Sequence, residues 1–135
     1  MSFVGTLKTA RGCGVTHAYM EYGNSIQDIE NKLKIIFPSL DMIPQGEDDS
    51  QAFSFISEEE ARPIIVDIFS KDLAYSSDLK SKPNADRLAN LFIESVQSPT
   101  TRYFTGSNLT NATFDTGVLA IGSDIYGLIW VEDED

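Results

Sequence analysis

The segment from Thr116 to Val131 reads TGVLAIGSDIYGLIWV and carries two apolar runs close together. Two apolar runs, Thr116–Ile121 and Ile125–Val131, are separated by Gly122–Asp124, a composition that suits a short turn. The pattern predicts an antiparallel β-hairpin. We expect Trp130, in the second strand, to anchor the hydrophobic core, because a buried indole removes a large apolar area from water.

Two stretches upstream show the spacing of amphipathic helices. The first begins at Ser25, which has Asp28 three residues later as in a capping box, and ends before Pro38. Its apolar stripe comprises Ile26, Ile29, Leu33, Ile36 and Phe37. The second helix is predicted from about Asn84 to Gln97, between two prolines. Its apolar stripe comprises Ala85, Leu88, Leu91, Phe92 and Val96.

The segment between these helices is predicted to be mainly extended. Ala52–Ile56 alternates polar and apolar residues, as a half-buried strand does. Arg62–Phe69 is rich in β-branched residues and is predicted as a further strand, which places Glu58–Glu60 at the tip of a hairpin. A helix over Glu58–Ile68, with Pro63 in its first turn, is the alternative.

These elements together predict an α+β fold in a single domain spanning residues 1–135. One or two more strands are expected between Phe3 and Tyr22, where β-favouring aromatic residues gather. We expect two main helices packed on one face of a mostly antiparallel sheet of five or six strands. A chain of 135 residues suffices for one such core and is too short for two.

The chain is strongly acidic, with 21 acidic and 10 basic residues and a net charge of -11. This balance argues against direct binding to nucleic acid or to an anionic membrane, because both are held by Lys and Arg. No apolar run approaches the roughly 20 residues that cross a bilayer, and no secretory signal is visible. With a single cysteine in addition, we expect a cytoplasmic protein.

Residues suited to catalysis or metal binding are few. Cys13 and His17 form the one possible thiol–imidazole pair, and in a strand they would lie roughly 13 Å apart. One cysteine and one histidine cannot build a closed zinc site, and Gly46–Asp49 lacks the ligand spacing of a calcium loop. We predict no catalytic residue, no cofactor and no metal. A small cysteine-dependent enzyme is the interpretation that Cys13 and His17 leave open.

The acidic residues, in contrast, are concentrated in short runs. Residues 47–60 contain six carboxylates and no Lys or Arg, and Glu132–Asp135 adds four more. Such runs either solubilise the surface or form a field complementary to a basic partner, which steers association. For the second case, the carboxylates expected to pair with the partner's Lys and Arg are Glu47, Asp48, Asp49, Glu58, Glu59 and Glu60. Tyr75 and Tyr103 are expected to supply exposed apolar anchors.

In size, acidity and these acidic runs, the chain resembles the immunity proteins that neutralise bacterial toxins, including those of contact-dependent growth inhibition. The closing segment Gly127–Asp135 contributes to the resemblance. It implies a basic protein partner, a cognate toxin domain that we interpret as a nuclease, bound tightly and blocked at or beside its active site. The same charge pattern is also compatible with a nucleic-acid mimic that inhibits a host defence nuclease, or with a housekeeping scaffold domain.

Overall fold

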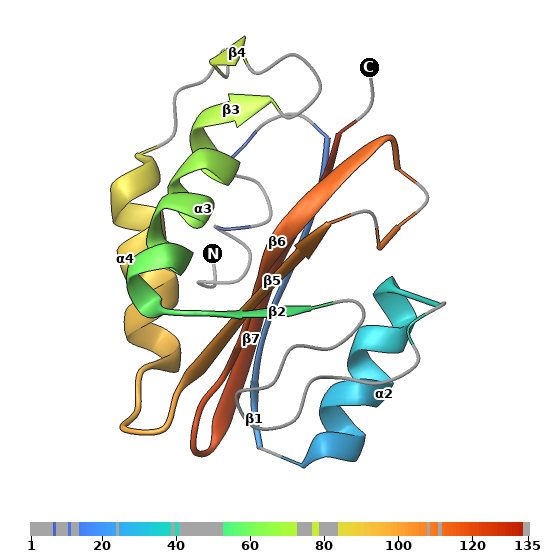
Figure 1. Cartoon of the computed structure of the whole chain (residues 1–135), viewed down its shortest axis with the longest axis vertical. Coiled ribbons are helices and arrows are strands. Elements are labelled where there is room, and N and C mark those ends of the chain that lie inside the picture. Colours follow the sequence, from blue (N-terminus) through green and yellow to red (C-terminus); the bar gives the residue numbers. More distant parts are fainter. Residues whose placement is uncertain are drawn as a thin grey trace.

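The computed structural model describes residues 7, 11, 14–23, 25–38, 40, 53–72, 77–78, 84–107, 109–110 and 112–133 (Figure 1). These residues form a five-stranded antiparallel sheet, three helices packed against it, and a separate pair of two-residue strands. The predicted α+β class with a mostly antiparallel sheet of five or six strands is therefore confirmed, and a third helix accompanies the two predicted main helices.

The sheet has the strand order β1-β7-β6-β5-β2. Its strands are β1 (Val15–Tyr22), β2 (Ser54–Ile56), β5 (Arg102–Ser107), β6 (Phe114–Ile121) and β7 (Ile125–Asp133). The two short strands are β3 (Lys71–Asp72) and β4 (Ser77–Asp78). The helices are α2 (Ile26–Ile36), α3 (Glu58–Ser70) and α4 (Ala85–Val96). No strand at the position of β5 is among the elements that the sequence predicts.

The predicted C-terminal hairpin is confirmed and lies in the middle of the sheet. Strands β6 and β7 pair from Phe114 opposite Asp133 to Ile121 opposite Tyr126. The turn is closed by the Gly122 N–H, which donates to the Ile125 carbonyl at 2.8 Å. Nearly all residues of both strands are buried, so the hairpin is the core of the fold rather than an edge.

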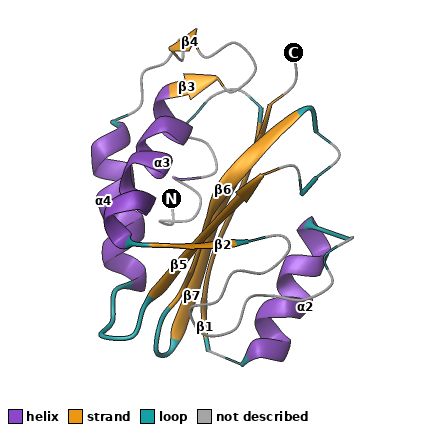
Figure 2. Cartoon of the chain, viewed as in Figure 1, coloured by secondary structure: helices purple, strands orange, loops and turns teal. Residues whose placement is uncertain are grey.

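The helices cover both faces of the sheet, as Figure 2 shows, and the prediction that they share one face is wrong. Helices α3 and α4 pack on the face that carries Val118, Ala120 and Ile129. Helix α2 packs on the opposite face, against Leu119 and Leu128. The uninterrupted apolar run of β7 is the reason, because a strand buried on both faces has no polar alternation.

Helices α2 and α4 agree with the prediction, and the predicted cap of α2 at Ser25 is confirmed. The Ser25 Oγ accepts from the Asp28 N–H at 3.4 Å, and the Asn84 Oδ1 accepts from the Arg87 N–H at 3.2 Å. Each cap satisfies one of the N–H groups that the first turn of a helix leaves without an intrahelical partner.

The predicted strand over residues 62–69 is wrong, and the alternative, a helix over Glu58–Ile68, is confirmed, because this segment belongs to α3. Its buried residues Ala61, Ile65, Ile68 and Phe69 recur with helical rather than alternating spacing. The helix is started by a reciprocal capping box. The Glu60 N–H donates to the Ser57 Oγ at 3.1 Å, and the Ser57 N–H donates to the Glu60 Oε1 at 3.0 Å. Pro63 lies on the exposed side of the second turn, where water can reach the carbonyl that its missing N–H leaves unpaired.

Candidate functional site

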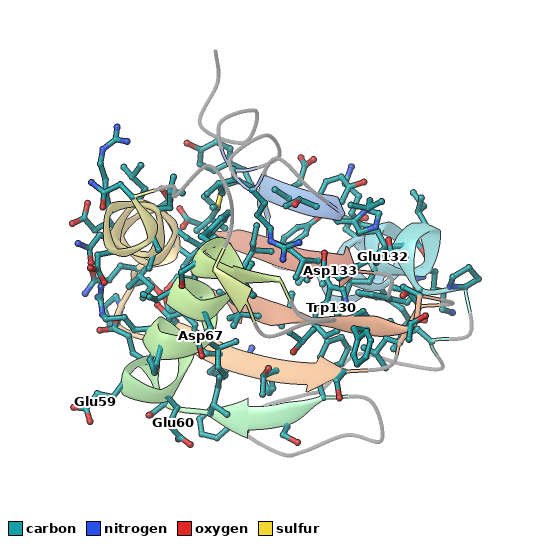
Figure 3. All side chains as sticks on the ribbon, turned by 90° about the horizontal axis from the view of Figure 1, so that it is seen from above. Glu59, Glu60, Asp67, Trp130, Glu132 and Asp133 are labelled. Carbon is teal, nitrogen blue, oxygen red and sulfur yellow. The ribbon has the colours of Figure 1, made fainter. Side chains whose placement is uncertain are left out.

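The structure describes three of the six predicted partner-binding residues. Glu58, Glu59 and Glu60 form the first turn of α3, and all three are exposed. Figure 3 shows Glu59 and Glu60 at the end of this helix. The three glutamates do not cap a β-hairpin, as the sequence predicts. Glu47, Asp48 and Asp49 lie outside the described residues, so whether the two acidic runs share a surface stays a prediction.

The first two residues of the closing acidic run do not belong to a free terminus. Glu132 and Asp133 belong to β7 and each is paired, Glu132 with His17 and Asp133 with Arg11. Asp133 is 2 % exposed. Both carboxylates are engaged in pairs within the fold; Asp133 is buried, whereas the Glu132 side chain stays partly exposed.

Helices α3 and α4 together carry a larger acidic surface than the sequence predicts. We define the α3–α4 acidic surface as Glu58, Glu59, Glu60, Asp67, Asp86 and Glu94, all of them exposed. The same two helices contain two basic residues, Arg62 and Arg87. Within the described ranges, none of the six carboxylates lies at ion-pair distance from a basic side chain.

Helix α2 shows a different arrangement of charge. Its Lys32 Nζ lies 3.2 Å from Glu21 Oε1 on β1, and its Lys34 Nζ lies 2.9 Å from Glu30 Oε1 one turn earlier. Both lysines of this helix are therefore paired with a neighbouring carboxylate. The unbalanced negative field of the described chain is concentrated on the α3–α4 side.

Part of the acidic surface has a local structural function. Carboxylates in the first turn of a helix interact favourably with its macrodipole, and Glu60 is a partner in the capping box. Glu58, Glu59 and Asp67 make no such hydrogen bond among the described residues. These three are therefore the better reporters of binding, because neutralising them leaves the cap intact.

Tyr103 is not the exposed anchor that the sequence predicts. Its side chain is 3 % exposed and packs in the core between the sheet and the α3–α4 layer. Among the described residues, its hydroxyl is a buried polar group without a hydrogen-bond partner. Burial raises the pKa of Tyr103 to about 12, with the nearby Glu58 carboxylate raising it further and the Arg62 guanidinium lowering it. Tyr75, the second predicted anchor, lies outside the described residues.

This raised pKa predicts a loss of stability in alkali. The unfolded chain releases the Tyr103 proton near pH 10, whereas the folded chain keeps it until about pH 12. The free energy of unfolding is therefore unaffected by this group below pH 10 and falls as the pH rises through the window from 10 to 12. Ultraviolet titration of tyrosinate, with urea unfolding at each pH, measures both effects. In Tyr103→Phe, the highest tyrosine step and the associated loss of stability should disappear.

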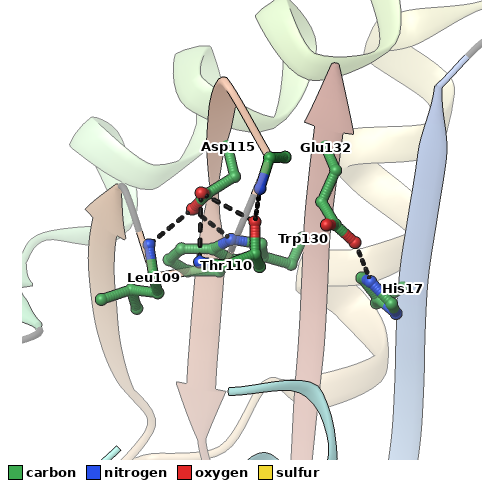
Figure 4. A network of polar contacts seen from close by, with 7 residues as sticks. His17, Leu109, Thr110, Asp115, Trp130 and Glu132 are labelled. Atoms are coloured by element: carbon green, nitrogen blue, oxygen red, sulfur yellow. Dashed lines mark hydrogen bonds and ion pairs between the residues drawn. The ribbon is translucent and has the colours of Figure 1, made fainter. Parts of the chain in front are cut away.

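A second polar cluster lies on the α2 side of the sheet, near the end of β7 (Figure 4). Asp115 is buried and accepts hydrogen bonds from the Leu109 N–H at 2.9 Å, from the Thr110 N–H and hydroxyl, and from the Trp130 Nε1–H at 2.9 Å. Its carboxylate thereby holds residues 109–110 against the central strands. Asp115 is not among the residues that the sequence predicts to matter, and its one local signal is that it directly precedes an apolar run.

His17 lies beside this cluster, on β1. Its Nε2 is 2.5 Å from Glu132 Oε2, and both side chains are about one quarter exposed. A carboxylate that orients an imidazole is one part of a nucleophilic site, but the nucleophile is needed as well. Cys13 is outside the described residues, so the cysteine-dependent enzyme stays an untested prediction.

The described ranges contain no group of three or more His, Cys, Asp or Glu residues arranged to hold a metal ion. No helix in those ranges is long and apolar enough to cross a membrane. Comparisons with protein-family models, with curated proteins and with solved structures found no match to this chain.

Proposed function

We propose that this protein is an acidic, cytoplasmic, non-catalytic binding protein that neutralises a basic toxin domain, a nuclease in our interpretation. The observation that carries the proposal is the α3–α4 acidic surface. Its two adjacent helices carry six exposed carboxylates and only two guanidinium groups, and among the described residues none of the six carboxylates is in an ion pair.

Such a surface is suited to binding because its charges are not already engaged. Like charges held close together repel one another, and a basic surface that approaches them relieves this repulsion. The field also steers a positively charged partner and speeds its association, most strongly at low ionic strength. A nuclease presents the required positive surface where it holds phosphates, so a carboxylate-bearing protein bound there excludes the substrate by charge and by volume.

Helix α3 is better suited to present carboxylates to a partner than a disordered acidic segment would be. The first turn is fixed by the Ser57–Glu60 capping box, and the helix is anchored by Ile65, Ile68 and Phe69. The carboxylates of Glu58 and Glu59 are therefore presented from a rigid backbone, and binding need not order that backbone.

Co-purification with the product of the neighbouring gene tests the proposal. The tagged full-length chain is co-expressed with that product and washed at low and at high salt. A retained 1:1 complex with a basic domain, whose nuclease activity is blocked in the complex, is the expected result. No retained partner at either salt, or a partner whose activity is unaffected, contradicts the proposal. A retained host defence nuclease would instead support the nucleic-acid mimic.

A further inference from the structure

The Tyr103 hydroxyl is the buried polar group that the fold itself does not explain. It has no hydrogen-bond partner among the described residues, although a buried hydroxyl left unpaired is destabilising. Phenylalanine would fill the same space without this penalty. A tyrosine at this position therefore calls for a partner outside the described chain.

The position of Tyr103 directs its hydroxyl toward α3. In the sheet, Tyr103 is paired with Ile56 on β2, and Ile56 precedes the capping residue Ser57 and then Glu58. Its side chain belongs to the same buried cluster as Ala61 and Ile65 of α3. The hydroxyl lies near enough to Glu58 and Arg62 for both charges to act on its ionisation. The unpaired oxygen is thus beneath the first turns of the helix that carries the exposed glutamates.

We propose that the first turn of α3 and the Tyr103 hydroxyl form a binding site for one arginine side chain of the basic partner. The inference rests on the proposed function and adds to it a specific recognition point. In the complex, the Tyr103 oxygen accepts one N–H of the guanidinium, and the Glu58 carboxylate accepts others.

Guanidinium fits this site better than ammonium for two reasons. Its planar fork of N–H donors can reach a phenol oxygen and a carboxylate at the same time. It is also more weakly hydrated than an ammonium group, so less is lost when it is brought beside a buried hydroxyl.

Entry to the site has to uncover the Tyr103 oxygen. The Tyr103 oxygen is closed to solvent in the free protein. Glu58 and Glu59 are exposed and have no hydrogen bond or ion pair among the described residues, so they can change rotamer freely. Arg62 is held on the α4 side, where its Nη1 donates to the Asn90 Oδ1. Changes of rotamer without backbone movement are common when interfaces form.

The test compares hexa-arginine and hexa-lysine peptides binding to the full-length chain, by calorimetric titration at low salt. Three proteins are measured: the wild type, Tyr103→Phe, and Tyr126→Phe as the matched control on the opposite face of the sheet. We expect Tyr103→Phe to lose about tenfold in affinity for hexa-arginine and less than about twofold for hexa-lysine. Tyr126→Phe should change neither affinity.

Thermal unfolding of the same variants distinguishes a loss of binding from an effect of the substitution on the fold. Tyr103→Phe should raise the Tm by roughly 3 °C, because it removes an unpaired buried hydroxyl. A lower Tm would show that the hydroxyl is already satisfied, by ordered water for example, and would overturn the inference.

Failure of the inference can be told apart from failure of the proposed function. If both peptides bind the wild type and Tyr103→Phe equally, and Glu58→Gln with Glu59→Gln weakens both, the acidic surface binds cations and the arginine site does not exist. If neither peptide binds the wild type, the proposed function fails together with the inference.

Discussion

Arg11→Met is expected to lower the free energy of unfolding by about 3–5 kcal/mol, as urea denaturation will measure. Arg11 is buried, and its Nη1 and Nη2 donate to Asp133 Oδ1 and Oδ2 at 2.7 and 2.6 Å. Its Nε donates to the Ile68 carbonyl at 2.6 Å, in the last turn of α3. The substitution leaves a buried carboxylate without its cation and a helix-terminal carbonyl without this donor.

Two further variants test whether the ion pair is the cause. Lys34→Met removes a cation from the exposed pair with Glu30 and should change stability by less than about 0.5 kcal/mol. Arg11→Met combined with Asp133→Leu should be more stable than Arg11→Met alone, because no uncompensated charge remains buried. An Arg11→Met protein within about 1 kcal/mol of the wild type would show that the contacts of Arg11 with β7 and α3 do not stabilise the fold.

Trp130→Ala should be comparably destabilising, by about 3–5 kcal/mol. The indole is fully buried, and its ring forms edge contacts with Phe37 at 5.0 Å and Phe53 at 6.0 Å between centroids. It lies over Gly117, where a Cβ would come within 2.7 Å of the Trp130 ring. Truncation leaves a large cavity between α2 and the central hairpin, which these rings cannot refill without rearranging.

Trp130→Phe separates the hydrogen bond from the packing. It keeps most of the apolar volume but removes the Nε1–H that Asp115 accepts, so a loss of about 1–3 kcal/mol is expected. Because Trp130 is the only tryptophan, unfolding of these variants should be followed by circular dichroism instead of fluorescence. Equal losses for the Phe and Ala variants would mean that the hydrogen bond, and not the packing, dominates.

The elements predicted correctly from the sequence are those whose signal is local. The β6–β7 hairpin is marked by a turn between two apolar runs, α2 by a capping residue followed by an apolar stripe, and α4 by an apolar stripe between two prolines. Each signal lies within about a dozen residues. No long-range contact is needed to interpret it.

The strand interpretation of Arg62–Phe69 is wrong and the helical alternative is correct, because the local signals in this segment conflict. The β-branched residues of Arg62–Phe69 favour a strand, and Pro63 is unfavourable inside a helix. Burial of Ala61, Ile65 and Ile68 against the sheet outweighs both preferences. The motif Ser57-x-x-Glu60 is the local sign of a helix start. A helix that starts there places the glutamates at its N-terminus and not in a turn.

The features that locate the candidate site depend on contacts between distant residues. The pairing of Arg11 with Asp133 spans 122 positions, and the burial of Tyr103 follows from the strand pairing and from α3 lying above it. Nothing in the sequence near these residues indicates such contacts. The clustering of acidic residues is visible in the sequence, but the contribution of α4 to the same surface is not.

Whether the α3–α4 acidic surface binds the basic partner is decided by association rates at low and high salt. The partner is the co-purified basic domain. The α3 variant carries Glu58→Gln, Glu59→Gln and Asp67→Asn, which spare the capping residue Glu60. The control carries the same change of charge elsewhere, as Asp28→Asn, Glu30→Gln and Asp124→Asn. We predict that the α3 variant associates about tenfold more slowly at low salt and with a flatter salt dependence, while the control resembles the wild type. Equal rates for the α3 variant and the control would show that this surface is not where the partner binds.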